Sequence, residues 1–342
     1  MLNFKNIKKK LIIAEIGQSH NGSLNQAKKL IDLTAKAGAD IIKFQTHYAD
    51  SESTYNEKFR KGFKFSHKTR FDYWKANEFK KKEWLEIKKY SNKKNLIFTS
   101  SPFSEKAFYT LKSIGVNLWK IGSGEFFSDD LINLILKTKH PIILSTGLSN
   151  WKEIKEKVKL LKKNKKNFII LQCTTKYPLP LKEVGINVVY EMKNRFNCPV
   201  GLSDHSGSIY PSLLALADDF TQLIEVHVSK NLNKKNPDKS SSLSFDDLKL
   251  ICDFRNNLEI LKNNKVDKDK ISRSLLSTKK LFTKSLALRN DLKKGQILYK
   301  KNLCFKKPGN GLGRNSISKI IGLKTRRNIS KNILLKRSFF EK

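Results

Sequence analysis

Lysine and serine side chains recur at the ends of short apolar runs, where they could bind a small anion together. Lysine supplies a positive charge and serine a hydroxyl donor, without the planar geometry of the arginine fork. Such a set suits a small ligand that carries phosphate and carboxylate groups. The residues of this type at the run ends are Lys43, Ser101, Lys120, Ser123, Ser145 and Ser203. They define a predicted anion subsite.

Two histidines at the ends of neighbouring runs indicate a second subsite. His205 and His227 each have an acidic residue within two positions in the sequence. Imidazole nitrogen is a common ligand of divalent transition metals. Glu15 and Asp238 are the acidic residues that we expect close to them. A packed core position is the alternative interpretation of either histidine alone, but two on adjacent runs favour one shared metal ion.

Eight short apolar runs carry these residues, and amphipathic helical stretches separate the runs. Strands that alternate with helices pair in parallel, and eight such units within about 250 residues predict a closed (β/α)8 TIM barrel. Active sites of such barrels lie at the C-terminal strand ends, so the polar run ends would converge there. An open doubly wound sheet is the alternative, but no Gly-rich dinucleotide motif follows the first run. The predicted strands are 11–16, 40–46, 96–101, 117–121, 141–146, 168–174, 199–204 and 223–228, and predicted helices include 24–37, 80–92, 105–114, 151–163, 209–218 and 245–261.

Two regions depart from this alternation. Residues 48–77 form an aromatic and basic insertion after the second run, which we interpret as a lid or an extra helix. The pattern also changes after about residue 247, which predicts a barrel over 1–262, a Lys- and Ser-rich linker over 263–282 and a small module of β-like segments over 283–342. A module of this size needs a docking surface to be stable.

Charge, cysteines and hydropathy narrow the class of protein. The chain has 342 residues and a net charge of +38, which alone would suggest a nucleic-acid or anionic-membrane binder. The excess is nearly all lysine, 59 against 10 arginines, and it falls mostly at helical spacing, as expected for solvated helix faces. Four scattered cysteines with no CxxC pair favour a reducing cytoplasm. We expect neither a membrane span nor a secretory signal, because no apolar run is long enough.

Several motifs, in their order along the chain, resemble those of the sialic acid synthase (N-acetylneuraminate synthase) family. The C-terminal module resembles the antifreeze-like (SAF, β-clip) domain of that family. The resemblance covers essentially the whole chain. The motifs are IAEIGQSHNG at 13–22, KFQT at 43–46, KIGSGE at 120–125, LSTG at 144–147, CTTKYP at 173–178, GLSDH at 201–205 and KPGNG at 307–311.

The resemblance implies an enzyme that condenses phosphoenolpyruvate with an N-acylated hexose, such as N-acetylmannosamine, to a nonulosonic acid and phosphate. It also implies a domain-swapped homodimer in which the C-terminal module of one subunit caps the barrel of the other. The implied ion is Mn²⁺, with Mg²⁺ or Co²⁺ as alternatives. By resemblance, the residues that contact phosphoenolpyruvate are Lys43, Ser101, Lys120, Ser123, Ser145, Thr175 and Ser203. The residues that would act on the sugar and on the reacting water are Glu15, Gln45, Tyr177 and Asp238. Further substrate contacts in the C-terminal module would be Lys307 and Asn310, and the metal ligands would be His205 and His227.

Three positions depart from the family pattern, and the first of them concerns the acceptor sugar. Lys307 stands where the family has an arginine that contacts the N-acyl group, and lysine cannot reproduce a bidentate arginine contact. Val226 stands where a cation is common, and Ser19 where asparagine is frequent. A legionaminate or other nonulosonate synthase is therefore the alternative enzyme. The alternative from another class is a basic nucleic-acid-binding protein on a barrel scaffold, which would not need the polar strand ends.

Overall fold

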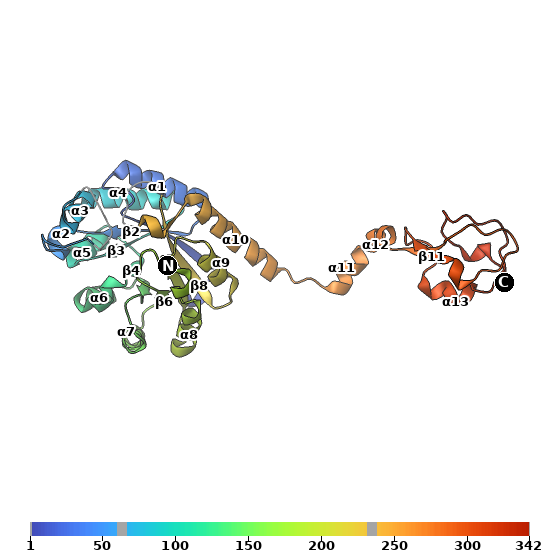
Figure 1. Ribbon diagram of the computed structural model, residues 1–342. Coiled ribbons are helices and arrows are strands. Elements are labelled where there is room, and N and C mark those ends of the chain that lie inside the picture. Colours follow the sequence, from blue (N-terminus) through green and yellow to red (C-terminus); the bar gives the residue numbers. More distant parts are fainter. Residues whose placement is uncertain (1, 60–66, 231–237, 342) are drawn as a thin grey trace. The chain divides into compact units, whose positions relative to one another are not determined.

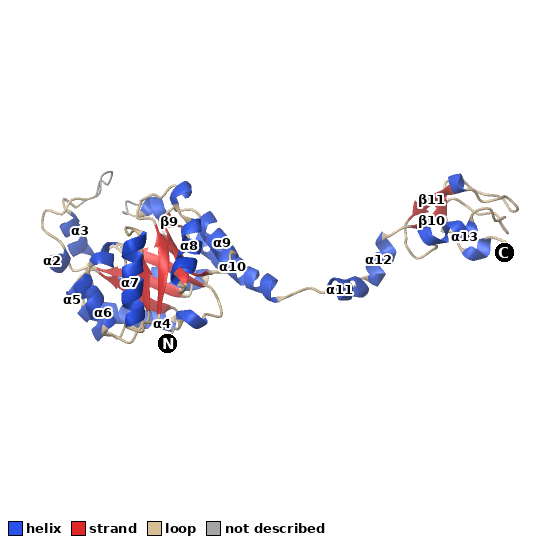
Figure 2. Ribbon diagram, turned by 90° about the horizontal axis from the view of Figure 1, so that it is seen from below, coloured by secondary structure: helices blue, strands red, loops and turns tan. Residues whose placement is uncertain are grey.

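The chain forms two compact units in the computed structural model, which describes residues 2–59, 67–230 and 238–341. The first unit spans Met1–Asn263 and the second Asn264–Lys342. Figures 1 and 2 show a ring of strands wrapped by helices in the first unit and a small, loop-rich fold in the second. No helix among the described residues is long and apolar enough to cross a membrane.

Eight parallel strands of the described residues close into a barrel in the first unit. Strands that follow each other in the sequence are neighbours in the sheet, and β1 pairs with β8 to close the ring. The predicted TIM barrel is therefore confirmed and the open sheet is excluded. The strands are β1 (Leu11–Gly17), β2 (Ile41–Thr46), β3 (Ile97–Pro102), β4 (Trp119–Ile121), β5 (Ile142–Ser145), β6 (Phe168–Cys173), β7 (Val200–Asp204), β8 (Thr221–Val228) and the short β9 (Ser242–Leu243), which pairs with β8.

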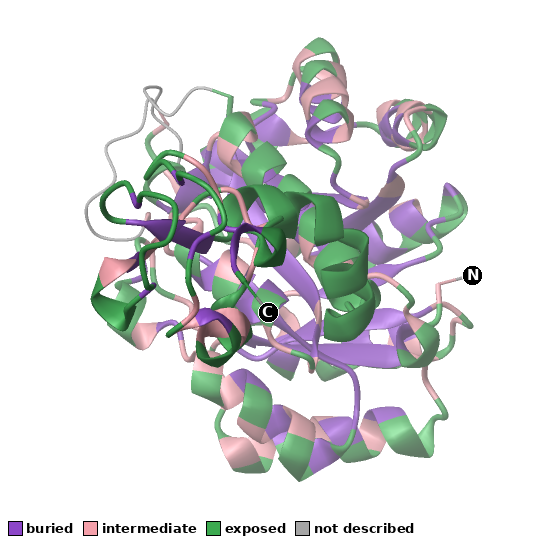
Figure 3. Cartoon of the chain, turned by 90° about the vertical axis from the view of Figure 1, so that its right-hand side faces the viewer, coloured by how far each residue is buried: buried purple, intermediate pink, exposed green. Residues whose placement is uncertain are grey.

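Helices cover the outside of the ring, and exposed residues lie on their outer faces (Figure 3). Lysines such as Lys152, Lys155 and Lys159 are exposed, as the sequence predicts. In α7, Ile154, Val158 and Leu161 are buried, and each such side chain contributes about 1.5–3 kcal/mol of hydrophobic free energy. Asn150 starts this helix with a capping box that involves Glu153. The helices of the first unit are α1 (Leu24–Ala37), α2 (Ala49–Glu52), α3 (Arg70–Asn77), α4 (Lys81–Lys93), α5 (Glu105–Ser113), α6 (Asp129–Leu136), α7 (Trp151–Lys163), α8 (Ile186–Phe196), α9 (Tyr210–Ala217) and α10 (Phe245–Asn263).

Side chains alternate between two layers of core along the barrel strands. Ile13, Ile41, Ile143 and Leu223 pack together in one cluster, whereas their strand neighbours pack in the larger cluster that includes the helices. This alternation has a period of two residues. Because the strands are parallel, their C-terminal ends lie at one end of the barrel, and the alternation points every second side chain there toward the barrel interior.

The insertion after β2 contains two helices in its described part, so the extra-helix interpretation holds for residues 49–52 and 70–77. Residues 60–66 of the insertion lie outside the described residues. Thr69 and Asp72 form a capping box at the start of α3. Ala49, Phe71 and Trp74 then bury their side chains together with Tyr73 in a small separate core. The insertion is thus a packed part of the barrel unit.

The second unit contains a small β core preceded by two short helices. The predicted linker forms α11 (Lys268–Ser274) and α12 (Leu276–Phe282), in which no residue is buried. β10 (Ser285–Leu288) pairs antiparallel with β11 (Leu303–Lys306), and α13 (Ile317–Ile320) follows. The core of this unit includes Leu286, Leu298, Leu335 and Phe340, all at most 2% exposed.

Candidate active site

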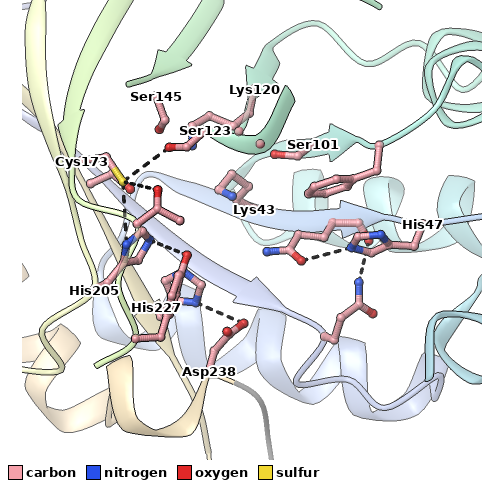
Figure 4. A pocket seen from close by; sticks show the side chains of 18 of the residues that line it. Lys43, His47, Ser101, Lys120, Ser123, Ser145, Cys173, His205, His227 and Asp238 are labelled. Atoms are coloured by element: carbon pink, nitrogen blue, oxygen red, sulfur yellow. Dashed lines mark hydrogen bonds and ion pairs between the residues drawn. The ribbon is translucent and has the colours of Figure 1, made fainter. Parts of the chain in front are cut away.

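A cavity of about 360 Å³ opens at the C-terminal ends of the barrel strands, within the size range of small-ligand sites (Figure 4). Residues from all eight barrel strands, or from the loops that follow them, line it. Its lining is Gln18, Lys43, Gln45, His47, Phe59, Arg70, Tyr73, Trp74, Ser101, Phe103, Lys120, Gly122, Ser123, Gly124, Ser145, Leu148, Cys173, Thr175, Tyr177, Ser203, His205, Glu225, His227 and Asp238.

Two lysines and two glutamates form a buried charge cluster at the base of the cavity. Lys43 Nζ lies 2.5 Å from Glu15 Oε2 and 3.6 Å from Glu225 Oε1. Lys120 Nζ lies 3.0 Å from the same Glu225 oxygen, which also accepts a hydrogen bond from Ser203 Oγ at 3.1 Å. All four charged residues are at most 4% exposed. The cluster therefore places two lysine side chains against two glutamate side chains.

Burial and these partners set the pKa values of the cluster. Burial would raise the pKa of Glu225, but Lys120 and Lys43 outweigh it and lower that pKa to about 2. Burial raises the pKa of Glu15 above its ordinary value, against the opposing charge of Lys43. Burial likewise lowers the pKa of Lys120, whereas the carboxylates of Glu15 and Glu225 raise that of Lys43 despite its burial. Lys43 and Lys120 therefore both act on Glu225, and the four residues do not form two independent ion pairs.

Serine hydroxyl groups surround the lysines, and two of these hydroxyls have no hydrogen-bond partner among the described residues. The Oγ atoms of Ser101 and Ser145 are buried and form no hydrogen bond with the residues that the structure describes. Unpaired buried hydroxyls are rare in folded proteins and indicate a place where a ligand supplies the missing bond. Ser123 Oγ accepts from the backbone N–H of Gly147 at 3.0 Å. The predicted anion subsite therefore converges at the cavity, where Figure 4 shows Lys43, Ser101, Lys120, Ser123 and Ser145, and Ser203 also lines it.

Gly147 keeps this cradle open. A Cβ atom at this position would lie 2.3 Å from Thr175 Oγ1, 2.7 Å from Cys173 Sγ and 2.8 Å from Ser123 Oγ. Such distances are shorter than any stable contact, so three lining groups would have to move. The LSTG motif thus needs glycine at its last position for a steric reason.

The two predicted metal ligands face each other, with His205 directly after β7 and His227 on the neighbouring strand β8. The ring centroids of His205 and His227 are 5.1 Å apart. His205 Nε2 lies 3.0 Å from the hydroxyl of Tyr177, and His227 Nδ1 lies 3.7 Å from Asp238 Oδ2. These donor types fit a divalent ion. Among the described residues, however, no group of three or more His, Cys, Asp or Glu side chains is arranged to hold one.

Cys173 contacts the same histidine. Its Sγ lies 3.7 Å from His205 Nδ1 and 3.6 Å from Ser123 Oγ. Burial would raise the pKa of this thiol, but His205 outweighs burial and lowers it. Burial would in turn lower the pKa of His205, but the thiol raises it to about 9. Metal binding at His205 would therefore displace a proton.

The cavity brings together most of the residues singled out in the sequence. Glu15 is fully buried behind the lining, where Gln45 Nε2 donates to its Oε1 at 2.7 Å. Lys307 and Asn310 lie in the second unit, on the exposed loop after β11. The residues that line the cavity as expected are Lys43, Gln45, Ser101, Lys120, Ser123, Ser145, Thr175, Tyr177, Ser203, His205, His227 and Asp238.

Several lining residues have no role in the sequence-based prediction. The sequence places Glu225 on the same face of β8 as His227, two positions before it, but assigns it no role in the site. Cys173, which ends β6, likewise has no assigned role. The aromatic wall formed by His47, Trp74 and Phe103 carries no comparable signal, because loop contacts bring its members together.

Comparisons with known proteins identify the class to which this fold and this cavity belong. The NeuB family matches residues 30–267, and the SAF domain matches residues 283–341. The chain belongs to the NeuB family, as its motifs indicate, and is an enzyme of that family.

Particular relatives are synthases of sialic-type acids. An N,N'-diacetyllegionaminic acid synthase from Campylobacter jejuni is 34% identical over 96% of this chain and 100% of its own length. A pseudaminic acid synthase from Campylobacter jejuni is 31% identical over 99% of this chain and 98% of its own. The crystal structure of an N-acetylneuraminic acid synthetase from Leptospira borgpetersenii, in complex with citrate, has a TM-score of 0.68 and 30% identity over 80% of this chain and 92% of its own.

Proposed function

We propose that this protein condenses phosphoenolpyruvate with the open-chain aldehyde of an N-acylated sugar, to give a nonulosonic acid and phosphate. The observation that carries the proposal is the buried cradle of Lys43 and Lys120 with the unpaired hydroxyls of Ser101 and Ser145. Phosphoenolpyruvate offers a phosphate and a carboxylate, which match cations and free hydroxyl donors. Relatives named as legionaminic and pseudaminic acid synthases support this reaction class.

The reaction needs a carbon–carbon bond, a water and a leaving phosphate. The enol carbon attacks the aldehyde carbon, and water adds to the resulting oxocarbenium at C2. The tetrahedral hemiketal phosphate then expels phosphate by cleavage of its C–O bond, while Lys43 and Lys120 stabilise the developing anion. Because burial raises the pKa of Glu15, its carboxylate is suited to accept the proton of the adding water.

Two histidines would hold a divalent ion beside the acceptor sugar. His205 and His227 supply two imidazole ligands, and we propose Mn²⁺ as the ion, with Mg²⁺ or Co²⁺ as alternatives. Such a Lewis acid polarises an aldehyde oxygen when it is bound. Tyr177, through its hydroxyl near His205 Nε2, would orient the same end of the sugar.

The acceptor sugar is the finer part of the proposal. N-acetylmannosamine and a diacetamido sugar of the legionaminate type differ in the substituents that must fit beside the aromatic wall. The 34% identity to a diacetyllegionaminic acid synthase supports the second. Lys307 in the second unit favours an acceptor that does not depend on a bidentate arginine contact.

An assay of phosphate release tests the function directly. The protein is incubated with phosphoenolpyruvate and a panel of N-acylated hexoses, each with and without added Mn²⁺. Phosphoenolpyruvate labelled with ¹⁸O at the bridging oxygen should yield labelled phosphate, because the C–O bond breaks. Release of phosphate without an acceptor, or unlabelled phosphate, would contradict the proposed condensation.

A further inference from the structure

His47 lies directly after β2, between two aromatic rings. Its ring stacks on Trp74 at a centroid distance of 3.8 Å and 9° between planes, and on Phe103 at 4.1 Å and 19°. The imidazole is 5% exposed. Trp74 belongs to α3 of the insertion, and Phe103 follows β3. The two rings fix the plane of the imidazole and leave its nitrogens at the edges.

Both ring nitrogens have partners, and these partners form a chain that ends at the charge cluster. Nδ1 of His47 lies 2.6 Å from Glu52 Oε1, and Nε2 lies 3.2 Å from Gln45 Oε1. Gln45 Nε2 in turn donates to Glu15 Oε1 at 2.7 Å, and Glu15 contacts Lys43. One continuous path therefore runs from α2 of the insertion to the base of the cavity.

The direction of these hydrogen bonds follows from the amide of Gln45. Its NH₂ group faces the Glu15 carboxylate, because the opposite orientation would set the amide oxygen against a carboxylate oxygen. The amide oxygen therefore faces His47, and an amide oxygen can only accept. Nε2 of His47 must then carry the proton. Nδ1 is free to accept from the Glu52 carboxyl, or the pair shares that proton.

The surroundings of Glu52 agree with this direction. Within the described part of the chain, Glu52 Oε2 is buried without a hydrogen-bond partner, which disfavours a full negative charge, and this burial outweighs the backbone of Tyr48, which favours the carboxylate. Burial raises the pKa of Glu52 to about 8 and lowers that of His47 to about 3. A protonated Glu52 beside a neutral His47 therefore satisfies the chain near pH 7.

We propose that His47 is a positioning residue, whose Nε2–H holds the side-chain amide of Gln45 with its NH₂ group toward Glu15. The proposal rests on the proposed function for its consequence, since Gln45 lines the cavity where the acceptor sugar and the reacting water would bind. Glu52 sets the tautomer of His47, and the two aromatic rings set its plane. The insertion thereby governs a residue of the active site without entering the chemistry.

The tautomer of His47 can be measured without any activity. Long-range ¹H–¹⁵N correlation spectra of the full chain, labelled at histidine, distinguish a protonated Nε2 from a protonated Nδ1. The His47→Gln variant assigns the resonance by its loss. We expect Nε2 to be protonated at pH 7, and an unprotonated Nε2 would overturn the proposal even if the protein makes no nonulosonic acid.

Kinetic variants then separate positioning from packing. His47→Phe keeps the ring stack and removes both nitrogens, so kcat should fall about tenfold, as for the loss of one hydrogen bond, while the KM for phosphoenolpyruvate changes little. His47→Gln can donate at the same place and should restore part of kcat. Glu52→Gln still donates to Nδ1 and should keep kcat near that of the wild type.

A packing control guards against general loss of structure. Phe98→Leu, in the buried core of β3 outside the cavity lining, should lower the melting temperature without lowering kcat. If His47→Phe behaves like this control, with kcat unchanged, His47 serves packing alone and the proposal is wrong. Absence of activity in the wild type would instead contradict the proposed function and leave the tautomer measurement as the test of His47.

Discussion

The lysines at the base of the cavity differ in their partners, and this difference has measurable consequences. Lys43 contacts both glutamates of the cluster, whereas Lys120 contacts Glu225. The sequence could predict that these lysines meet, because strand ends converge in a barrel. It could not predict Glu225 as their shared partner, because Lys120 and Glu225 are 105 residues apart and approach each other across the barrel interior.

Lys120→Met should raise the KM for phosphoenolpyruvate far more than the KM for the acceptor. Loss of a buried, charge-assisted hydrogen bond to an anion costs about 2–3 kcal/mol, or about 30- to 160-fold. Steady-state kinetics with each substrate varied in turn would measure both constants. Lys137→Met removes an exposed lysine from the same chain and should change neither. Equal effects of Lys120→Met on the two substrates would show that Lys120 holds the rim together instead.

Glu52→Gln should change how stability depends on pH. The pKa of Glu52 is about 8 in the folded protein, against an ordinary value of 4.5, because burial and the nearby Glu57 and Glu78 outweigh the backbone hydrogen bond of Tyr48 and the charge of Arg70. Between these values the folded state binds one more proton than the unfolded state, so wild-type stability falls as the pH rises and levels off above about pH 8.

The window from pH 6.5 to 8 isolates this effect. There His47, whose folded pKa is about 3, stays neutral in the folded state, and its partial protonation in the unfolded state is common to both proteins and cancels when they are compared. The wild type should lose about tenfold in its folding equilibrium per pH unit relative to Glu52→Gln. Urea unfolding at several pH values would measure this difference, and parallel curves for the two proteins would refute it.

His205→Ala and His227→Ala should each weaken binding of Mn²⁺ and remove most activity without unfolding the chain. Each substitution deletes one of two neighbouring imidazole ligands. Electron paramagnetic resonance of free Mn²⁺ reports binding independently of turnover, and circular dichroism reports the fold. His140→Ala, on a residue outside the cavity lining, is the matched control. Full turnover of the wild type after exhaustive chelation would contradict a metal-dependent reaction.

At the scale of elements, the strands and their spacing were predictable and the insertion was not. β1 to β8 appear as apolar runs bounded by turn residues, so their order and the closed barrel follow from simple periodicity. In the insertion, α2 has four residues and α3 eight, which is too short for a clear helical period. The capping box of Thr69 and Asp72 is the local signal that could have located α3.

The loop after β5 provides a test at this scale. Gly147→Ala should abolish tight binding of phosphoenolpyruvate, because the new Cβ would displace Thr175, Cys173 and Ser123. Gly313→Ala adds the same methyl group outside the cavity lining, where no atom of the described residues lies within 4 Å, and should change affinity little. Isothermal titration with phosphoenolpyruvate would compare the two variants. Similar affinities would mean that the cradle adapts and that the glycine is not needed for space.

At the scale of the molecule, the domain-swapped homodimer stays a prediction from the family resemblance. It can be tested by complementation between a barrel lesion, Glu15→Ala, and a cap lesion, Asn310→Trp, each first shown to be inactive alone. The two are unfolded, mixed in equal amounts and refolded. Random pairing gives mixed dimers for about half of the molecules, and each has one intact site, so about a quarter of wild-type activity should return.

The alternative arrangement gives a different result in the same experiment. If each C-terminal module acts on its own barrel, every site in the mixture carries one lesion. No activity should then return at any mixing ratio. Sedimentation of the wild type would establish separately whether the protein is dimeric.

The pairing of β1 with β8 also bears on when the charge cluster is assembled during folding. Glu15 pairs in register with His227 across this seam, and the charge cluster draws on β1, β2, β4 and β8. A chain growing from the ribosome therefore holds Glu15, Lys43 and Lys120 before their shared partner Glu225 has been made. The contacts that close the ring join residues far apart in the sequence, and such contacts form slowly. We therefore expect the residues of the charge cluster to lose their hydration together, late in folding, when β8 docks.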